Sequence, residues 1–195
     1  MMMTFEQIKS KLKDRTVGIA GCGGLGSNCA VALARVGVGK LIICDFDKID
    51  ESNLNRQFYF YDQIGQQKAP TLKENINRIN PGVEVNAFDI KLDPDSITEL
   101  FRNCDVIVEA FDRADMKKMI IETVLTEMKN KPIVSGIGMA GWGESNSIQM
   151  KQNGNLYICG DGSSEACHDN PPLAPRVGIT ANMQANTVLE ILLKQ

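Results

Sequence analysis

Short apolar runs along this chain alternate with segments in which apolar residues recur at helical spacing. That alternation is typical of βαβ units and predicts a mostly parallel sheet flanked by helices, a Rossmann-like α/β fold. Ligands of such sheets bind beyond the carboxyl ends of the strands, so the residues after each strand are site candidates. The predicted strands are 17–20, 41–44, 83–88, 106–108 and 132–136, and the predicted helices are 25–36, 66–79, 93–103 and 114–129.

The pattern changes after residue 136. Residues 147–150 and 156–159 predict an antiparallel pair, joined by an Asn-Gly turn within 152–154. Residues 160–175 have no periodicity and contain adjacent prolines, so we expect a loop there, followed by a helix from about Pro175. Because no repeats or linkers interrupt the chain, residues 1–195 are expected to form one domain with an antiparallel extension near the C-terminus.

Composition narrows the possible partners. The 195 residues carry a net charge of −3 and no stripe of Lys and Arg, which argues against nucleic acid and anionic lipid. The nearest approach to a basic patch is Lys117 with Lys118, which we expect on a solvated helix face. No apolar run is long enough for a membrane span, and residues 1–15 lack the apolar core of a signal peptide. We therefore expect a cytoplasmic location.

The first predicted strand leads into a glycine-rich turn. Gly21, Gly23 and Gly26 match the pattern G-x-G-x-x-G, and Gly24 adds a further glycine. Glycine lets backbone N–H groups approach a phosphate at the positive end of the following helix. Asp45 ends the second strand, where a carboxylate can accept both ribose hydroxyl protons. These residues predict a nucleotide site without distinguishing NAD from ATP, and a purely structural turn is the alternative.

Two cations follow Asp45 along the chain. Arg56 lies three residues after Asn53, and Lys68 lies near the start of the next predicted helix. Loop amides can largely satisfy a pyrophosphate, whereas a triphosphate carries about four negative charges and requires cations. Arg56 offers a planar fork and Lys68 a point charge aimed at the carboxyl edge of the sheet. The alternative interpretation is two solvated side chains.

Asp112 follows the buried strand 106–108 and so also lies at the carboxyl edge. A hard carboxylate there suits Mg²⁺, which typically uses one or two carboxylates together with phosphate oxygens. Asp is also a favoured helix N-cap, and a predicted helix begins at Ala114. Both interpretations of Asp112 are open at this point.

Together these motifs resemble the ubiquitin-activating-enzyme-like superfamily, and within it the bacterial ThiF-type sulfur-carrier adenylyltransferases of thiamine and molybdopterin synthesis. The similarity covers about residues 16–193, and the segment 52–57 is far more specific than the glycine loop. The matching motifs are Gly21–Gly26, Asp45–Asp47, Ser52–Gln57, Gly65–Lys68, Arg78–Pro81 and Asp112.

The resemblance implies ATP and Mg²⁺ as cofactors. It implies a role for each matching residue, with Asp45 on the ribose, Gly24, Asn53, Arg56 and Lys68 around the phosphates, and Asp112 on Mg²⁺. The nucleotide-binding half would span about 16–112 and the carrier-binding part about 132–175. The implied reaction is attack by the C-terminal glycine carboxylate of a small ubiquitin-like sulfur carrier ending in Gly-Gly on the ATP α-phosphate. The resemblance favours the thiamine pathway and implies a homodimer.

The chain departs from the family pattern in its cysteines and arginines. Most relatives hold zinc through two C-x-x-C pairs, but this chain has none, so no zinc is predicted. Arg15 is the sole arginine before the first strand, where relatives usually carry an arginine-containing arm that reaches into the neighbouring subunit. Arg113 follows Asp112 where the family usually shows Asn.

Cys167 lies in the loop where ThiF-type relatives carry a thiol that joins the carrier. A nucleophilic thiolate requires a nearby cation or base, and His168 is the only histidine of the chain. An incidental exposed thiol is the alternative. Cys22, Cys29, Cys44 and Cys104 lie in or beside apolar segments, where we expect buried free thiols.

Two other functions are compatible with parts of this pattern. A nicotinamide-dependent oxidoreductase would account for the glycine loop and Asp45 but leaves Arg56 and Lys68 unexplained. A non-catalytic module would use the adenylating fold to recruit a carrier or a tRNA-modifying partner without turnover. The adenylyltransferase is the leading hypothesis because it accounts for the cations as well.

Overall fold

The computed structural model describes residues 3–194 of the chain and contains one seven-stranded sheet. The strands are β1 (Thr16–Ala20), β2 (Lys40–Cys44), β3 (Glu84–Phe88), β4 (Val106–Glu109), β5 (Ile133–Gly136), β6 (Gln149–Asn153) and β7 (Leu156–Gly160). The helices are α1 (Phe5–Leu12), α2 (Gly24–Val36), α3 (Lys68–Ile79), α4 (Pro94–Phe101), α5 (Ala114–Glu127) and α6 (Ala174–Lys194). Three short 3-10 helices cover Glu51–Asn53, Tyr61–Gln63 and Ser145–Ser147.

The strands lie in the order β3-β2-β1-β4-β5-β7-β6. All neighbours are parallel except β6 and β7, which form the antiparallel pair. The order reverses direction between β1 and β4, which is where open sheets of this class bind their ligands. The predicted α/β fold with an antiparallel extension is therefore confirmed.

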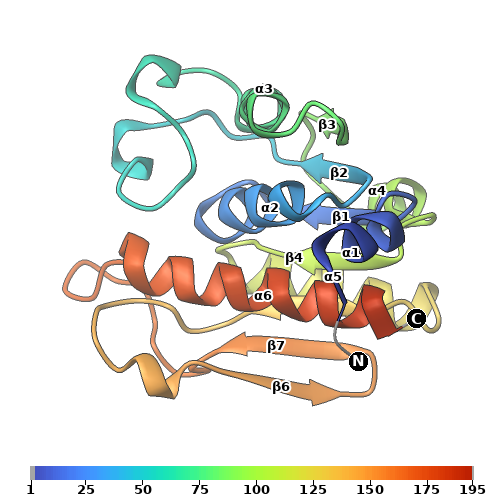
Figure 1. The fold of residues 1–195 in the computed structure, drawn as a ribbon. Coiled ribbons are helices and arrows are strands. Elements are labelled where there is room, and N and C mark those ends of the chain that lie inside the picture. Colours follow the sequence, from blue (N-terminus) through green and yellow to red (C-terminus); the bar gives the residue numbers. More distant parts are fainter. Residues whose placement is uncertain (1–2, 195) are drawn as a thin grey trace.

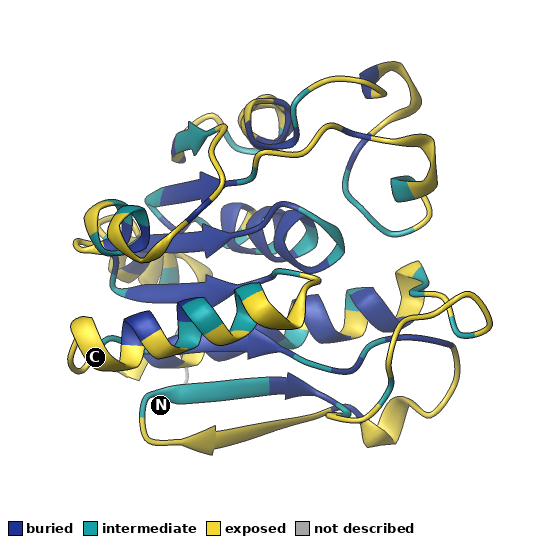
Figure 2. Cartoon of the chain, turned by 180° about the vertical axis from the view of Figure 1, so that it is seen from behind, coloured by how far each residue is buried: buried dark blue, intermediate teal, exposed yellow. Residues whose placement is uncertain are grey.

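Helices cover both faces of the sheet (Figure 1). Helices α2 and α6 pack against each other on the front face, and α4 and α5 pack on the back face. Alternate residues of each strand serve the two cores: Ile43 and Val108 point to the front, and Ile42 and Ile107 to the back. Strands β4 and β5 are buried throughout, β1 and β2 are buried except for their half-buried first residues, and the edge strand β6 is exposed (Figure 2). Among the described residues no helix could cross a membrane.

The structure differs from the predicted elements in four ways: element ends shift by a few residues, a first helix is added, the hairpin turn moves, and three short 3-10 helices lie within the connections. Helix α1 was not predicted; Thr4 caps it, and it buries Leu12. The hairpin turn falls at Gly154 and residue 155, slightly later than predicted, since Asn153 still pairs with Leu156. Gly154 has φ 59°, a backbone conformation that glycine adopts without strain.

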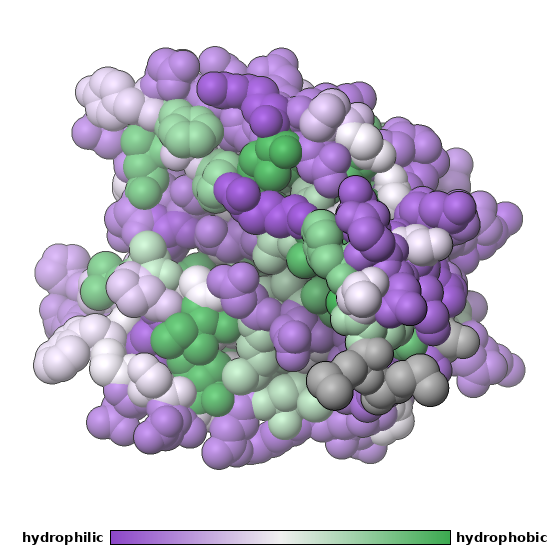
Figure 3. Space-filling view, viewed as in Figure 1, coloured by the Kyte–Doolittle hydropathy of each residue, from purple (hydrophilic) through white to green (hydrophobic). Residues whose placement is uncertain are grey.

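The loops that follow the parallel strands gather on one side of the molecule, at the left of Figure 1. Residues 45–65 form the upper loop there, and residues 137–147 and 161–173 form the lower loops. The space-filling view is notched between the upper and lower parts on this side (Figure 3). This edge of the sheet therefore presents the candidate residues.

Candidate functional site

The glycine loop is fixed by close backbone contacts. A Cβ on Gly26 would lie 1.8 Å from the carbonyl oxygen of Gly21, so no other residue fits there. Gly21 itself has φ 96° and lies against the carbonyl of Ala110 in the neighbouring β4–α5 loop. Helix α2 then begins after Gly23 without a side-chain cap. An uncapped, positively polarised helix end at the switch point of the sheet suits an anion such as phosphate.

Asp45 joins the end of β2 to the glycine loop. Its Oδ2 accepts a hydrogen bond from the backbone N–H of Cys22 at 2.7 Å, and its Oδ1 accepts one from that of Asp47 at 2.8 Å. Each carboxylate oxygen can accept a further hydrogen bond, so the capacity for two ribose hydroxyls remains. Burial raises the pKa of the Asp45 carboxyl, and nearby Lys68 offsets part of that rise.

Lys68 is the first residue of α3, and its side chain is only 8% exposed. Its Nζ lies 2.9 Å from Oδ2 of Asp47, which is 51% exposed. An ammonium carries three donors, and this hydrogen bond uses one of them. Lys68 is therefore a buried cation held at the carboxyl edge with donors left for an anionic ligand. The interpretation of Lys68 as a solvated side chain is wrong.

Tyr59 is a part of this site that sequence reasoning missed. Its hydroxyl is buried, and its donor faces the carbonyls of Cys22 at 2.8 Å and Lys68 at 3.2 Å. Burial raises its pKa well above the ordinary value, so the group stays a neutral donor. Tyr59 thus ties the glycine loop to the start of α3. No pattern singles it out in the sequence, because it is one of several aromatic residues in an aperiodic loop.

Arg56 lies against the glycine loop. A Cβ added to Gly24 would contact Cγ of Arg56 at 3.4 Å. One guanidinium nitrogen donates to the carbonyl of Ser52 at 3.1 Å and to Oδ1 of Asn55 at 2.6 Å. These two bonds leave the other side of the planar fork available to a phosphate. Arg56 is therefore placed beside the loop at which a triphosphate would be bound.

Asn53 has a local partner. Its side-chain oxygen accepts from the backbone N–H of Asp50 at 3.1 Å, and the Asp50 side chain accepts from the backbone of Ser52 in return. This capping box starts the 3-10 helix that leads to Arg56. The structure thus gives Asn53 a role in shaping the segment, and its predicted contact with phosphate stays a prediction.

Asp112 is exposed beyond the end of β4. Helix α5 takes Arg113, not Asp112, as its N-cap residue and has no side-chain cap, so the capping interpretation of Asp112 is wrong. Within residues 3–194, no hydrogen bond to the Asp112 carboxylate is found, which leaves its oxygens available to a hard cation. Arg113 instead pairs with Asp115 at 2.6 Å, and both side chains are more than half exposed.

The two neighbouring lysines of α5 have different environments. Lys118 is 73% exposed, as expected for a solvated helix face. Lys117 is only 16% exposed and pairs with the fully buried Glu109, so its assignment to a solvated face is wrong. Lys117 lies on the same helical line as the buried Ile120 and Val124, a signal that could have revealed it.

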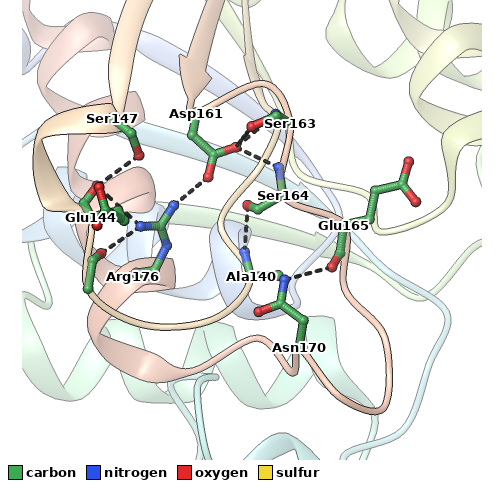
Figure 4. A network of polar contacts seen from close by, with 10 residues as sticks. Ala140, Glu144, Ser147, Asp161, Ser163, Ser164, Glu165, Asn170 and Arg176 are labelled. Carbon is green, nitrogen blue, oxygen red and sulfur yellow. Dashed lines mark hydrogen bonds and ion pairs between the residues drawn. The ribbon is translucent and has the colours of Figure 1, made fainter.

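The lower loops are held by an ion pair, which we call the Arg176 clamp (Figure 4). Arg176, at the start of α6, pairs with Asp161 just after β7, and both side chains are about 5% exposed. Arg176 also donates to the carbonyls of Gly143 (2.6 Å) and Glu144 (3.3 Å). Burial alone would raise the pKa of Asp161, but hydrogen bonds from Ser163 and Ser164 lower it to about 2. The sequence reasoning missed both members of this pair.

Cys167 lies apart from these groups, in an exposed turn within the lower loop. Its backbone exchanges two 3.2 Å hydrogen bonds with that of Asn170, and His168 and Asp169 lie at the tip. The His168 ring contacts Asp169 at 2.8 Å and is fully exposed. No Cys167–His168 hydrogen bond is found within residues 3–194. The other five cysteines are buried and free, as predicted for four of them.

The lower loop reaches the segment that carries Arg56. The carbonyl of Pro172 accepts from the Asn55 amide at 3.3 Å, and the carbonyl of Asn55 accepts from the backbone N–H of Ala174 at 3.2 Å. Arg15 lies far from this edge, at the amino end of β1, where it pairs with Asp105 at 3.0 Å. Among the described residues no group of three or more His, Cys, Asp or Glu side chains could hold a metal.

The sequence of this chain is similar to those of known proteins. The model of the ThiF family matches residues 2–195. The adenylyltransferase and sulfurtransferase MOCS3 of Caenorhabditis briggsae is 33% identical over 95% of this chain and 48% of its own length. The molybdopterin-synthase adenylyltransferase of Salmonella typhimurium is 28% identical over 93% of this chain and 74% of its own.

Solved structures share the fold. The Escherichia coli tRNA N6-threonylcarbamoyladenosine dehydratase TcdA in complex with ATP superposes with a TM-score of 0.87 at 20% identity, covering 97% of this chain and 90% of that one. E. coli MccB with ATP gives a TM-score of 0.70 at 25% identity over 96% of this chain and 58% of that one. The chain spans about half the length of the first curated relatives that it matches.

Proposed function

Because the chain belongs to the ThiF family, we propose that it adenylates the C-terminal glycine carboxylate of a small ubiquitin-like sulfur carrier, using ATP and Mg²⁺. The observation that carries this proposal is the pair of cations at the glycine loop. Lys68 is buried there with two donors left over, and the side chain of Arg56 lies beside Gly24, since a Cβ added to Gly24 would be 3.4 Å from Cγ of Arg56. A dinucleotide does not require these charges, whereas a triphosphate does. Relatives named as adenylyltransferases support the same reaction.

The chemistry follows from positioning and charge. A carrier carboxylate oxygen forms a bond to the α-phosphorus while the bond from that phosphorus to the bridging oxygen breaks, and pyrophosphate leaves. The attacking carboxylate is already ionised, so no general base is required. Asp45 would hold the ribose, and Arg56 and Lys68 would hold the phosphate oxygens. Asp112 would ligate Mg²⁺, which supplies charge neutralisation at the phosphates.

The finer assignment concerns the carrier. We propose a carrier of the thiamine pathway that ends in Gly-Gly; the lack of the C-x-x-C pairs that most relatives carry favours this pathway by resemblance. The carrier tail would approach along the part 132–175, whose loop is bonded to the segment of Arg56 through Asn55. We also propose that the chain works as a homodimer in the cytoplasm, which sedimentation of the purified protein and fractionation of cells would test.

The experiment is ATP–pyrophosphate exchange with Mg²⁺ and separate carriers from thiamine, molybdopterin and tRNA-thiolation pathways. We expect exchange with the thiamine carrier, and none with the same carrier lacking its last glycine. Exchange with one of the other carriers would move the assignment to that pathway. ATP binding without exchange with any carrier would favour the non-catalytic module, and NAD binding without ATP binding would favour the oxidoreductase.

A further inference from the structure

The exposed Asp112 stands next to a buried polar network centred on Glu109, the last residue of β4. Glu109 is fully buried, and both of its carboxylate oxygens lie 3.0 Å from Nζ of Lys117. It also accepts from the Ser135 hydroxyl at 2.5 Å and from the backbone N–H of Phe111 at 2.7 Å. A buried ion pair is tolerated when further hydrogen bonds satisfy it, and this one is extensively satisfied.

Lys117 has no proton left for a ligand. An ammonium has three donors, and the partners of Lys117 are the two oxygens of Glu109 and, at 2.7 Å, the carbonyl of Gly136. Lys68 has one such partner. Lys117 therefore differs from the cations of the nucleotide site: it lies at the same edge of the sheet but cannot bind a phosphate without giving up its own contacts.

The network fixes the backbone that carries Asp112. Phe111, whose N–H is held by Glu109, directly precedes Asp112, and the N–H of Ala110 donates to the carbonyl of Ala20 in β1 at 2.9 Å. Lys117 links the start of α5 to the ends of β4 and β5. The Asp112 carboxylate has no hydrogen bond of its own among residues 3–194. Its position is thus set by the groups on either side of it.

We propose that Lys117 is a positioning residue that, with Glu109, fixes the Asp112 carboxylate for Mg²⁺. This inference rests on the proposed function, because it takes Asp112 as the metal ligand. Outer groups that orient a ligand typically change metal affinity 10- to 100-fold when they are removed. A merely structural ion pair would instead change stability and leave the contribution of the metal to ATP binding intact.

The test is ATP binding by calorimetry, with Mg²⁺ and with a chelator in its place, in the absence of any carrier. The main variant is Glu109→Gln combined with Lys117→Met, which removes both charges together and avoids leaving one of them buried alone. The matched control is Lys118→Met, on the same helix but exposed. We expect the double variant to bind metal-free ATP with the affinity of the wild type. The factor by which Mg²⁺ raises its ATP affinity should be at least about tenfold smaller than in the wild type.

If Mg²⁺ raises the ATP affinity of the folded double variant by the same factor as that of the wild type, the inference is overturned. If the double variant does not fold, Ser135→Ala removes one hydrogen bond from Glu109 and leaves the ion pair in place. A reduced Mg²⁺ effect in that variant supports the inference, and an unchanged one overturns it. Wild-type protein that binds no ATP would refute the proposed function itself, which is a different outcome.

Discussion

Lys68 beside the glycine loop and Arg176 at the start of α6 are both buried cations, but they use their donors differently. Lys68 makes one hydrogen bond, to the half-exposed Asp47. Arg176 pairs with the buried Asp161 and also donates to two backbone carbonyls. The first arrangement leaves two of the three ammonium donors for a ligand. The second uses the terminal guanidinium nitrogens to hold three segments of the protein together, and only the buried Nε has no partner among the described residues. A buried cation therefore indicates a ligand site where the protein leaves most of its charged head without acceptors.

The largest expected effect concerns Lys68, whose ammonium has donors left for a ligand. We expect Lys68→Ala to lower pyrophosphate exchange by about 10²- to 10³-fold, because a donor aimed at developing phosphate charge is lost. Stability should fall by a smaller factor than exchange does. The partner Asp47 is half exposed and returns to water, but the buried Asp45 loses the nearby cation that favours its ionised form. Exchange kinetics and thermal unfolding measure the two quantities, with Lys118→Ala as the exposed control. Exchange at the wild-type rate would remove Lys68 from the triphosphate site.

The Arg176 clamp should show the reverse behaviour. Arg176→Ala leaves Asp161 buried without its cation, which typically costs about 3 kcal/mol in the free energy of unfolding. Urea unfolding measures this loss, and we expect ATP binding to persist under native conditions. Arg176→Met combined with Asp161→Asn should recover part of the stability, because no unpaired charge remains. If Arg176→Ala and the wild type have the same free energy of unfolding, the Arg176 clamp does not stabilise the fold.

The pKa of Asp161 predicts how the clamp responds to acid. Its value of about 2 in the folded protein lies below the unfolded value of about 3.9. The folded state therefore binds protons less readily, and the stabilisation is fully present above the unfolded pKa and is lost as pH falls towards 2. Unfolding free energies of wild type and Asp161→Asn should converge over that acid range. Parallel pH profiles for the two proteins would contradict this expectation.

Cys167 provides the smallest expected effect. Because it is exposed in a surface turn, Cys167→Ser should leave both stability and pyrophosphate exchange unchanged. If the Cys167 thiolate attacks the carbonyl carbon of the carrier adenylate, a thioester forms and AMP leaves. The variant then loses only this covalent adduct, which intact-protein mass spectrometry detects after incubation with carrier and ATP. The buried Cys159→Ser serves as the matched control. An adduct that survives in Cys167→Ser would assign the covalent step to another group.

Local sequence signals predicted the positions of most residues of the candidate site. The glycines, Asp45 and Lys68 lie at strand and helix ends that hydrophobic periodicity marks, whereas Arg56 lies in the aperiodic loop between β2 and α3. Gly26 is required because a side chain there would collide with the carbonyl oxygen of Gly21, which is only five residues earlier. Asp112 was placed correctly at the end of β4, although its sequence context could not exclude a helix cap. Its role with Mg²⁺ and that of Asn53 with phosphate stay predictions.

The partners that were missed lie outside the same helix, strand or turn. Tyr59 donates to Cys22, 37 residues away, Lys117 pairs with Glu109, 8 residues away, and Arg176 pairs with Asp161, 15 residues away. A charged residue in an aperiodic or amphipathic segment looks solvated when only its neighbours in sequence are considered. The helical line of Lys117 with Ile120 and Val124 is a signal of its burial, whereas the packing of α6 against the sheet is what shows that Arg176 is buried.

The sequence by itself determined the elements, their order and the loop that suits a phosphate, because these depend on periodicity and on backbone freedom within a few residues. Tertiary structure decided which charges remain available. Lys68 and Lys117 are both lysines in the first turn of a helix at the same edge of the sheet. One has a single acceptor within reach and the other has three, and the number of acceptors depends on which strands lie beside each helix.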